Sequence, residues 1–137
     1  MKTSLHHFRH FLFLVLFLIS IALQAQEILG ASITWEKSTF DFGDIYQGDK
    51  VHHTFKFINS GKEPLMISNV EVTCGCTLPK SWPRNPVMQG DKGELEIQFN
   101  SAGKIGLQHK VVTVISNSVS GNSQITFTAN VLGKKEY

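Results

Sequence analysis

Cysteine is nearly absent from this chain of 137 residues, which contains only Cys74 and Cys76. A structural zinc site usually needs four ligands, and no second cysteine pair is present to complete one. The chain also lacks a glycine-rich phosphate loop, a Gly-x-Ser-x-Gly elbow and a His-Glu-x-x-His helix. These absences indicate a protein that is not an enzyme, with thiol redox activity as the remaining alternative.

Net charge is absent from most of the chain. Two of the 13 Lys and Arg residues, Lys2 and Arg9, lie in the first 25 positions, which leaves 11 basic residues against 11 acidic ones beyond them. A neutral domain without a basic patch offers no electrostatic attraction to a phosphate backbone. We therefore expect no nucleic-acid partner.

The N-terminus has the composition of an export signal. Lys2 and Arg9 precede an apolar run from Phe11 to Leu23, and Ala25 supplies a small residue for cleavage. The run is shorter than the roughly 20 residues that span a membrane comfortably. The sequence predicts a cleavable signal peptide at 1–25, with a retained anchor as the alternative. After cleavage no integral membrane segment would remain. The predicted location is therefore outside the cytosol, periplasmic or secreted, where disulfides persist.

The remaining residues, 26–137, show the period of two that is typical of β-strands and no helical period. Apolar side chains alternate with polar ones in three runs, and residues 107–116 are β-branched on both faces, as in a central strand. About seven short strands separated by turns predict an all-β, immunoglobulin-like β-sandwich, one domain with its core at about 33–132. A small barrel is the alternative. The alternating apolar positions are Val51, His53, Phe55 and Phe57; Leu95, Ile97 and Phe99; and Ile125, Phe127, Ala129 and Val131.

A proline-rich segment follows the cysteines. Residues 65–73 read as a strand that ends at the cysteine pair, and residues 78–90 contain Pro79, Pro83 and Pro86. Because proline has no N–H to donate, this segment is predicted to be a loop or a sheet edge. Trp82, Pro83 and Pro86 are the residues we expect to contact a partner, and main-chain strand addition at a sheet edge is one mode of contact.

The cysteine spacing leaves three interpretations open. Positions i and i+2 of a straight strand are about 6.6 Å apart, whereas a relaxed disulfide joins Cα atoms about 5.5–6 Å apart, so a bridge requires a bend that Gly75 permits. We expect both cysteines to belong to one strand, so the usual inter-sheet disulfide cannot form. The pair is then idle or locally bridged, or a redox dithiol, or a soft-metal site for copper or zinc with His53 or His109 as a third ligand. The first interpretation involves no cofactor.

Motifs spread over nearly the whole chain beyond the leader resemble one family. They are Phe40-Asp41-Phe42-Gly43-Asp44-Ile45, Gly48-Asp49-Lys50-Val51, Thr54-Phe55-Lys56-Phe57, Asn59-Ser60-Gly61, Pro64-Leu65, Cys74-Gly75-Cys76-Thr77, Pro86-Val87, Gly93, Gly103-Lys104-Ile105-Gly106 and Val114-Ile115-Ser116-Asn117. In their order and spacing they resemble the bacterial exported proteins grouped as domain of unknown function 1573. The resemblance implies an immunoglobulin-like module similar to Hydin and PapD-like domains, which mostly bind proteins or serve as scaffolds, and it implies no established activity.

Together these observations predict an exported, non-enzymatic interaction or scaffold module whose partner is another protein of the cell envelope. The alternative is a periplasmic dithiol protein that acts through Cys74 and Cys76 in redox exchange or copper binding.

Overall fold

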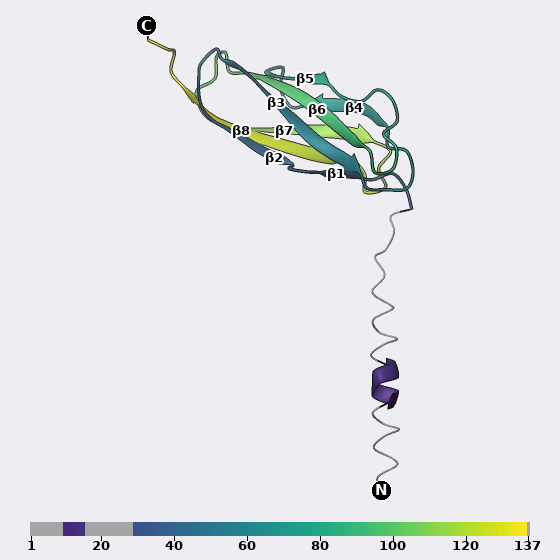
Figure 1. Cartoon of the computed structure of the whole chain (residues 1–137). Helices are drawn as coiled ribbons and strands as arrows, with labels where there is room; N and C mark the ends of the chain where they lie inside the picture. The colour runs from purple at the N-terminus through teal and green to yellow at the C-terminus, as the bar shows by residue number, and fades with distance from the viewer. Residues whose placement is uncertain (1–9, 16–28, 137) are drawn as a thin grey trace.

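Two four-stranded β-sheets lie face to face in the computed structural model of the chain (Figure 1). The structure describes residues 10–15 and 29–136, and residues 10–15 form a short piece of helix. Most of the predicted signal peptide, including its cleavage point, lies outside the described residues. Within the described ranges, no helix combines the length and the apolar character needed to cross a membrane.

One sheet has the strand order β1-β3-β6-β5 and the other has the order β2-β8-β7-β4. All neighbouring strands are antiparallel except β2 and β8, which run parallel. Because the strands form two separate sheets, the predicted immunoglobulin-like sandwich is confirmed, and the alternative of a small barrel is excluded. The strands are β1 (Ile33–Trp35), β2 (Thr39–Tyr46), β3 (Lys50–Asn59), β4 (Ile67–Val72), β5 (Thr77–Ser81), β6 (Lys92–Asn100), β7 (Gly106–Ser116) and β8 (Ser123–Leu132).

The strand that the sequence did not resolve is β5, at the start of the segment predicted to be a loop or an edge. It pairs only with β6 and contains Pro79, so it is an edge strand. An edge is where a strand tolerates proline, because one side of its ladder has no partner.

The expectation that both cysteines belong to one strand is wrong. Strand β4 ends at Val72, and Cys74, Gly75 and Cys76 lie in the turn that leads to β5. Because β4 and β5 belong to different sheets, the chain must leave one hydrogen-bonded ladder before it enters the other. The cysteines therefore lie where the chain crosses between the edges of the two sheets.

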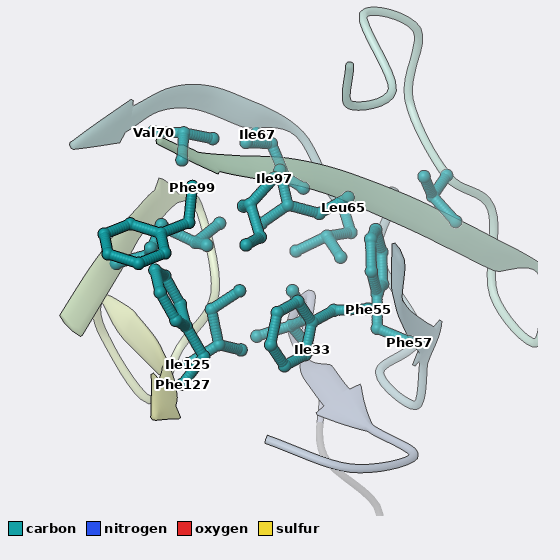
Figure 2. Packing of buried hydrophobic residues seen from close by; sticks show 14 of the residues in the cluster. Ile33, Phe55, Phe57, Leu65, Ile67, Val70, Ile97, Phe99, Ile125 and Phe127 are labelled. Atoms are coloured by element: carbon teal, nitrogen blue, oxygen red, sulfur yellow. The ribbon is translucent and has the colours of Figure 1, made fainter. Parts of the chain in front are cut away.

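Apolar side chains from the inner faces of both sheets fill the core (Figure 2). Phe55, Phe57 and Phe99 of one sheet and Phe127 of the other are all at most 1% exposed. The rings of Phe99 and Phe127 pack across the two sheets with their centroids 5.4 Å apart. Burying each such ring contributes about 1.5–3 kcal/mol relative to exposure. Strand β7 lies between β8 and β4, as its β-branched residues predicted.

A buried amide fixes the chain at one end of the sandwich. The Asn59 side chain is fully buried; its Oδ1 accepts hydrogen bonds from the N–H groups of Ser32 (3.2 Å) and Gly61 (3.0 Å). Its Nδ2 donates to the carbonyl oxygens of Glu63 (2.8 Å) and Val87 (2.9 Å). One side chain thus satisfies four main-chain groups from three separate segments, and three of its four bonds are buried.

Asn59→Ala would leave these four main-chain groups without their partner. Since each unsatisfied buried group costs about 1–3 kcal/mol, and some would regain water, we expect the free energy of unfolding to fall by about 3 kcal/mol or more. Urea denaturation followed by circular dichroism measures this loss.

The matched control is Asn69→Ala, which removes an exposed amide bonded only to the adjacent Val70 N–H. We expect this control to change stability by less than about 0.5 kcal/mol. Equal losses in the two variants would contradict the anchoring role of Asn59.

Candidate functional site

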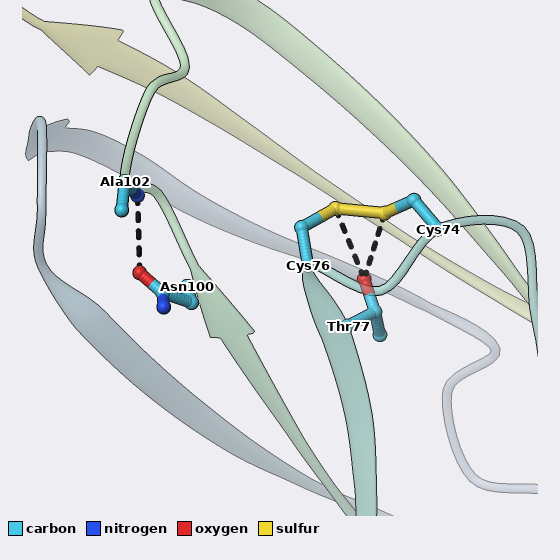
Figure 3. The surroundings of a disulfide bond; sticks show 5 residues. All are labelled: Cys74, Cys76, Thr77, Asn100 and Ala102. Carbon is cyan, nitrogen blue, oxygen red and sulfur yellow. Dashed lines mark hydrogen bonds between the residues drawn. A yellow bond between two sulfur atoms is a disulfide. The ribbon is translucent and has the colours of Figure 1, made fainter.

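The site begins with a disulfide between Cys74 and Cys76 in the turn that connects β4 to β5 (Figure 3). The two Cα atoms are 5.3 Å apart, closer than in a straight strand, so the chain bends at Gly75 as the spacing required. Gly75 has no left-handed φ, and a Cβ built on it would meet no atom within 4 Å. The turn is therefore uncovered on the Gly75 side.

Main-chain hydrogen bonds hold both ends of this turn. The Thr77 N–H donates to the Cys74 carbonyl oxygen (3.2 Å), and the Asn100 N–H donates to the Cys76 carbonyl oxygen (2.8 Å). The second bond attaches the turn to the end of β6. Since neither bond involves sulfur, the path of the backbone does not depend on the bridge alone.

Thr77 is a residue that the sequence analysis did not single out. It is 2% exposed, and its Oγ1 lies 3.8 Å from Cys74 Sγ and 4.0 Å from Cys76 Sγ. Because bridged sulfurs carry no hydrogen, the hydroxyl is the donor in both contacts, and it has no other hydrogen-bond partner in the described part of the chain. The only sequence signal for its role is its place directly after the second cysteine.

The two sulfurs have different surroundings. Both cysteines are half-buried, but the Cys76 side chain packs against the apolar core, and Cys74 is not among the described residues that do so.

The predicted partner-contact residues lie beyond β5. Trp82 is half-buried against the core, and the Arg84 guanidinium lies 3.8 Å above its ring centroid. The Trp82 indole N–H is buried and has no hydrogen-bond partner among the described residues. Pro83 is half-buried and Pro86 is exposed. Trp82 thus presents its ring to Arg84 and to the core rather than standing free.

Sequence analysis missed two exposed apolar side chains in the same segment, Leu78 (47% exposed) and Met88 (54% exposed). Their exposure could not be inferred from the sequence, because an irregular segment has no periodicity that separates its inner face from its outer face. We call residues 78–90 the rim.

The structure does not bring the candidate histidine ligands to the cysteines. His53 stacks on Phe40 with ring centroids 3.5 Å apart and meets Phe42 and Phe55 edge-on, and His109 is exposed on β7. Burial lowers the pKa of His53 below its ordinary value. In the described part of the chain, no group of three or more His, Cys, Asp or Glu side chains could hold a metal ion.

A family model described as "Protein of unknown function (DUF1573)" matches residues 33–131. This range begins with β1 and ends within β8, so the match covers the whole sandwich. No sequence among the curated proteins matches the chain.

Several solved structures share the fold at low sequence identity. A protein of unknown function from Porphyromonas gingivalis W83 is 15% identical, with a TM-score of 0.65; the match covers 77% of this chain and 49% of that one. The secreted serine protease VesC from Vibrio cholerae is 16% identical, with a TM-score of 0.56, over 76% of this chain and 23% of the protease. The ASH/PapD-like domain of human CEP192 is 9% identical, with a TM-score of 0.55, over 76% and 87%. This chain thus spans about half of the first structure and under a quarter of the second, and the likeness is one of fold alone.

Removing both cysteines should leave the fold intact. The bridge closes a loop of three residues, for which the chain-entropy relation gives about 1.6 kcal/mol, against about 4.7 kcal/mol for a 100-residue loop. We expect the double variant Cys74→Ala/Cys76→Ala to lose about 1–2 kcal/mol and to unfold cooperatively, as measured by urea denaturation. Loss of the cooperative transition would show that the bridge is a structural staple.

His53 should make stability depend on pH. The pKa of His53 in the folded chain is lower than its ordinary value of 6.5. The neutral ring therefore contributes fully to the stability of the fold above pH 6.5, and this stabilisation is lost as the pH falls through the pKa of the folded chain. We expect unfolding measured between pH 7.5 and 5 to show this loss in the parent and in His52→Ala, whose exposed ring lies on the opposite face of β3. His53→Phe should have a flatter profile. Parallel profiles for the parent and His53→Phe would exclude His53 as the cause.

Proposed function

Because this chain belongs to the DUF1573 family, in which no activity is described, we propose its function from its fold and surface: it is an exported, non-enzymatic interaction module of the cell envelope. Its inner faces are filled with apolar side chains, which leaves recognition to the outer surface. The observation that carries the proposal is the composition of the rim, which exposes apolar side chains beside basic ones.

The rim has a consistent chemical character. It carries Lys80 and Arg84 and no acidic residue, and Leu78 and Met88 are exposed beside them. Interfaces favour aromatic residues, Met and Arg over Lys and acidic residues, and Arg84 already lies on the face of Trp82. The partner that suits this surface is an exported protein with an apolar patch bordered by acidic side chains.

We propose that side chains rather than an added strand make the contact, because each of the four edge strands is short, irregular in register or contains proline. Strand β1 has only three residues, and β2 and β4 each have an irregularity in their register. In β5, Pro79 has no N–H, and the Thr77 N–H is already donated to Cys74. Short, bulged or proline-containing edges resist pairing with a further strand.

The predicted export signal supports the envelope location. The match to VesC, described as a secreted serine protease, involves a minor part of that chain. A sandwich of this kind therefore occurs as one part of a larger secreted protein. For the present chain we propose that the sandwich contacts a partner protein and does not catalyse a reaction.

Leu78→Ser tests the rim. We expect it to reduce capture of the envelope partner at least fivefold, because burying a leucine side chain contributes about 1.5–3 kcal/mol that serine does not supply. The full chain is expressed with its leader, cross-linked in a periplasmic extract of the native host, and its captured partner is quantified by mass spectrometry.

The matched control is Leu107→Ser, since Leu107 is also an exposed leucine (77%) but lies on β7 of the other sheet. Both variants should keep thermal midpoints within about 4 °C of the parent. Equal capture by the parent and Leu78→Ser, or equal loss in both variants, would count against the rim as the contact surface.

A further inference from the structure

The disulfide occupies an unusual place for a stabilising bridge. It links two residues of one turn, it closes a three-residue loop, and it joins neither sheet to the other. Both cysteines are half-buried and Gly75 between them is exposed, so the turn that carries the bridge is in contact with solvent. Solvent-accessible bridges are the labile or regulatory ones, whereas buried structural bridges resist exchange.

The surrounding backbone keeps the two cysteines in position when the bridge opens. The bonds from Thr77 N–H to the Cys74 carbonyl and from Asn100 N–H to the Cys76 carbonyl do not involve sulfur, so we expect both to remain when the sulfur–sulfur bond opens. The Cα atoms therefore stay near their separation of 5.3 Å, which is within the range that a disulfide requires. A dithiol held at this separation can close again.

We propose that Cys74–Cys76 is a thiol–disulfide exchange site that accepts two electrons from the dithiol of a partner protein. The sulfur attacked is Cys74 Sγ, because the Cys76 side chain packs against the core. The leaving sulfur is then Cys76 Sγ, 4.0 Å from the Thr77 hydroxyl. The Thr77 hydroxyl lies within reach of both sulfurs, so it can donate a hydrogen bond to the Cys76 thiolate as it forms, and stabilising the leaving thiolate speeds exchange.

The exchange balances in two steps. A partner thiolate bonds to Cys74 Sγ, the Cys74–Cys76 bond breaks, and Cys76 leaves as a thiolate that takes up a proton. The second partner thiolate then attacks the partner sulfur of this mixed disulfide, and Cys74 leaves as a thiolate and takes up the second proton. The partner loses two electrons and two protons and becomes a disulfide, while this chain gains them and becomes a dithiol.

The test uses dithiothreitol as the dithiol and the folded chain without denaturant. Samples are quenched with N-ethylmaleimide at intervals, and the reduced fraction is read from the intact mass, with circular dichroism to confirm that the fold persists. We expect complete reduction within minutes and full recovery of the bridge with oxidised glutathione. A bridge that is reduced only after the chain unfolds would overturn the proposal.

Thr77 variants test its positioning role. Thr77→Val removes the hydroxyl at nearly constant shape and should slow reduction about three- to tenfold, whereas Thr77→Ser should retain the parent rate. Thr73→Val is the control, because Thr73 is exposed and makes no hydrogen bond to either sulfur. If all three variants reduce at the parent rate, Thr77 has no role in the exchange.

Single cysteine variants test which sulfur is attacked. In Cys76→Ser, the remaining Cys74 should form a mixed disulfide with glutathione at least tenfold faster than the remaining Cys76 does in Cys74→Ser. The reverse order would overturn the assignment of Cys74 as the attacked sulfur.

Discussion

Apolar packing between the two sheets is the interaction on which the rest of this structure depends. No disulfide in the described part of the chain cross-links one sheet to the other, because the single bridge stays within one turn. The phenylalanines of β3, β6 and β8 are buried in the core. Because this packing holds the sheets together, the cysteines are free of the structural task that an inter-sheet bridge performs in many sandwiches of this kind.

A buried polar side chain in such a core costs little when its donors and acceptors are used. Asn59 meets this condition, and Gly61 beside it has no room for a Cβ, because the main chain near Gly30 and Ser32 approaches too closely. The Asn-Ser-Gly turn thus attaches the segment before β1 to the body of the sandwich through main-chain contacts.

The sequence predicted what repeats with a fixed period and missed what depends on contacts between distant segments. The alternation in β3, β6 and β8 predicted the inner faces, and the β-branched β7 predicted a central strand. The crossing of the chain between sheets at the cysteines was not predicted, because a run of apolar residues does not reveal which sheet each part joins. The orientation of the Thr77 hydroxyl and the exposure of Leu78 follow from tertiary packing, for which the sequence has no local signal.

Strand β5 connects the two surfaces for which functions are proposed. The disulfide turn precedes Thr77, and Trp82 follows Ser81, so both surfaces depend on one edge strand of five residues. The pairing of β5 with β6 and the bond from Asn100 to Cys76 do not involve sulfur, so opening the bridge leaves the register of β5 in place. A redox change at the cysteines is therefore transmitted to the rim only if it alters this pairing. Since a change in affinity needs a differential interaction in the two states, the two surfaces should act almost independently in one chain.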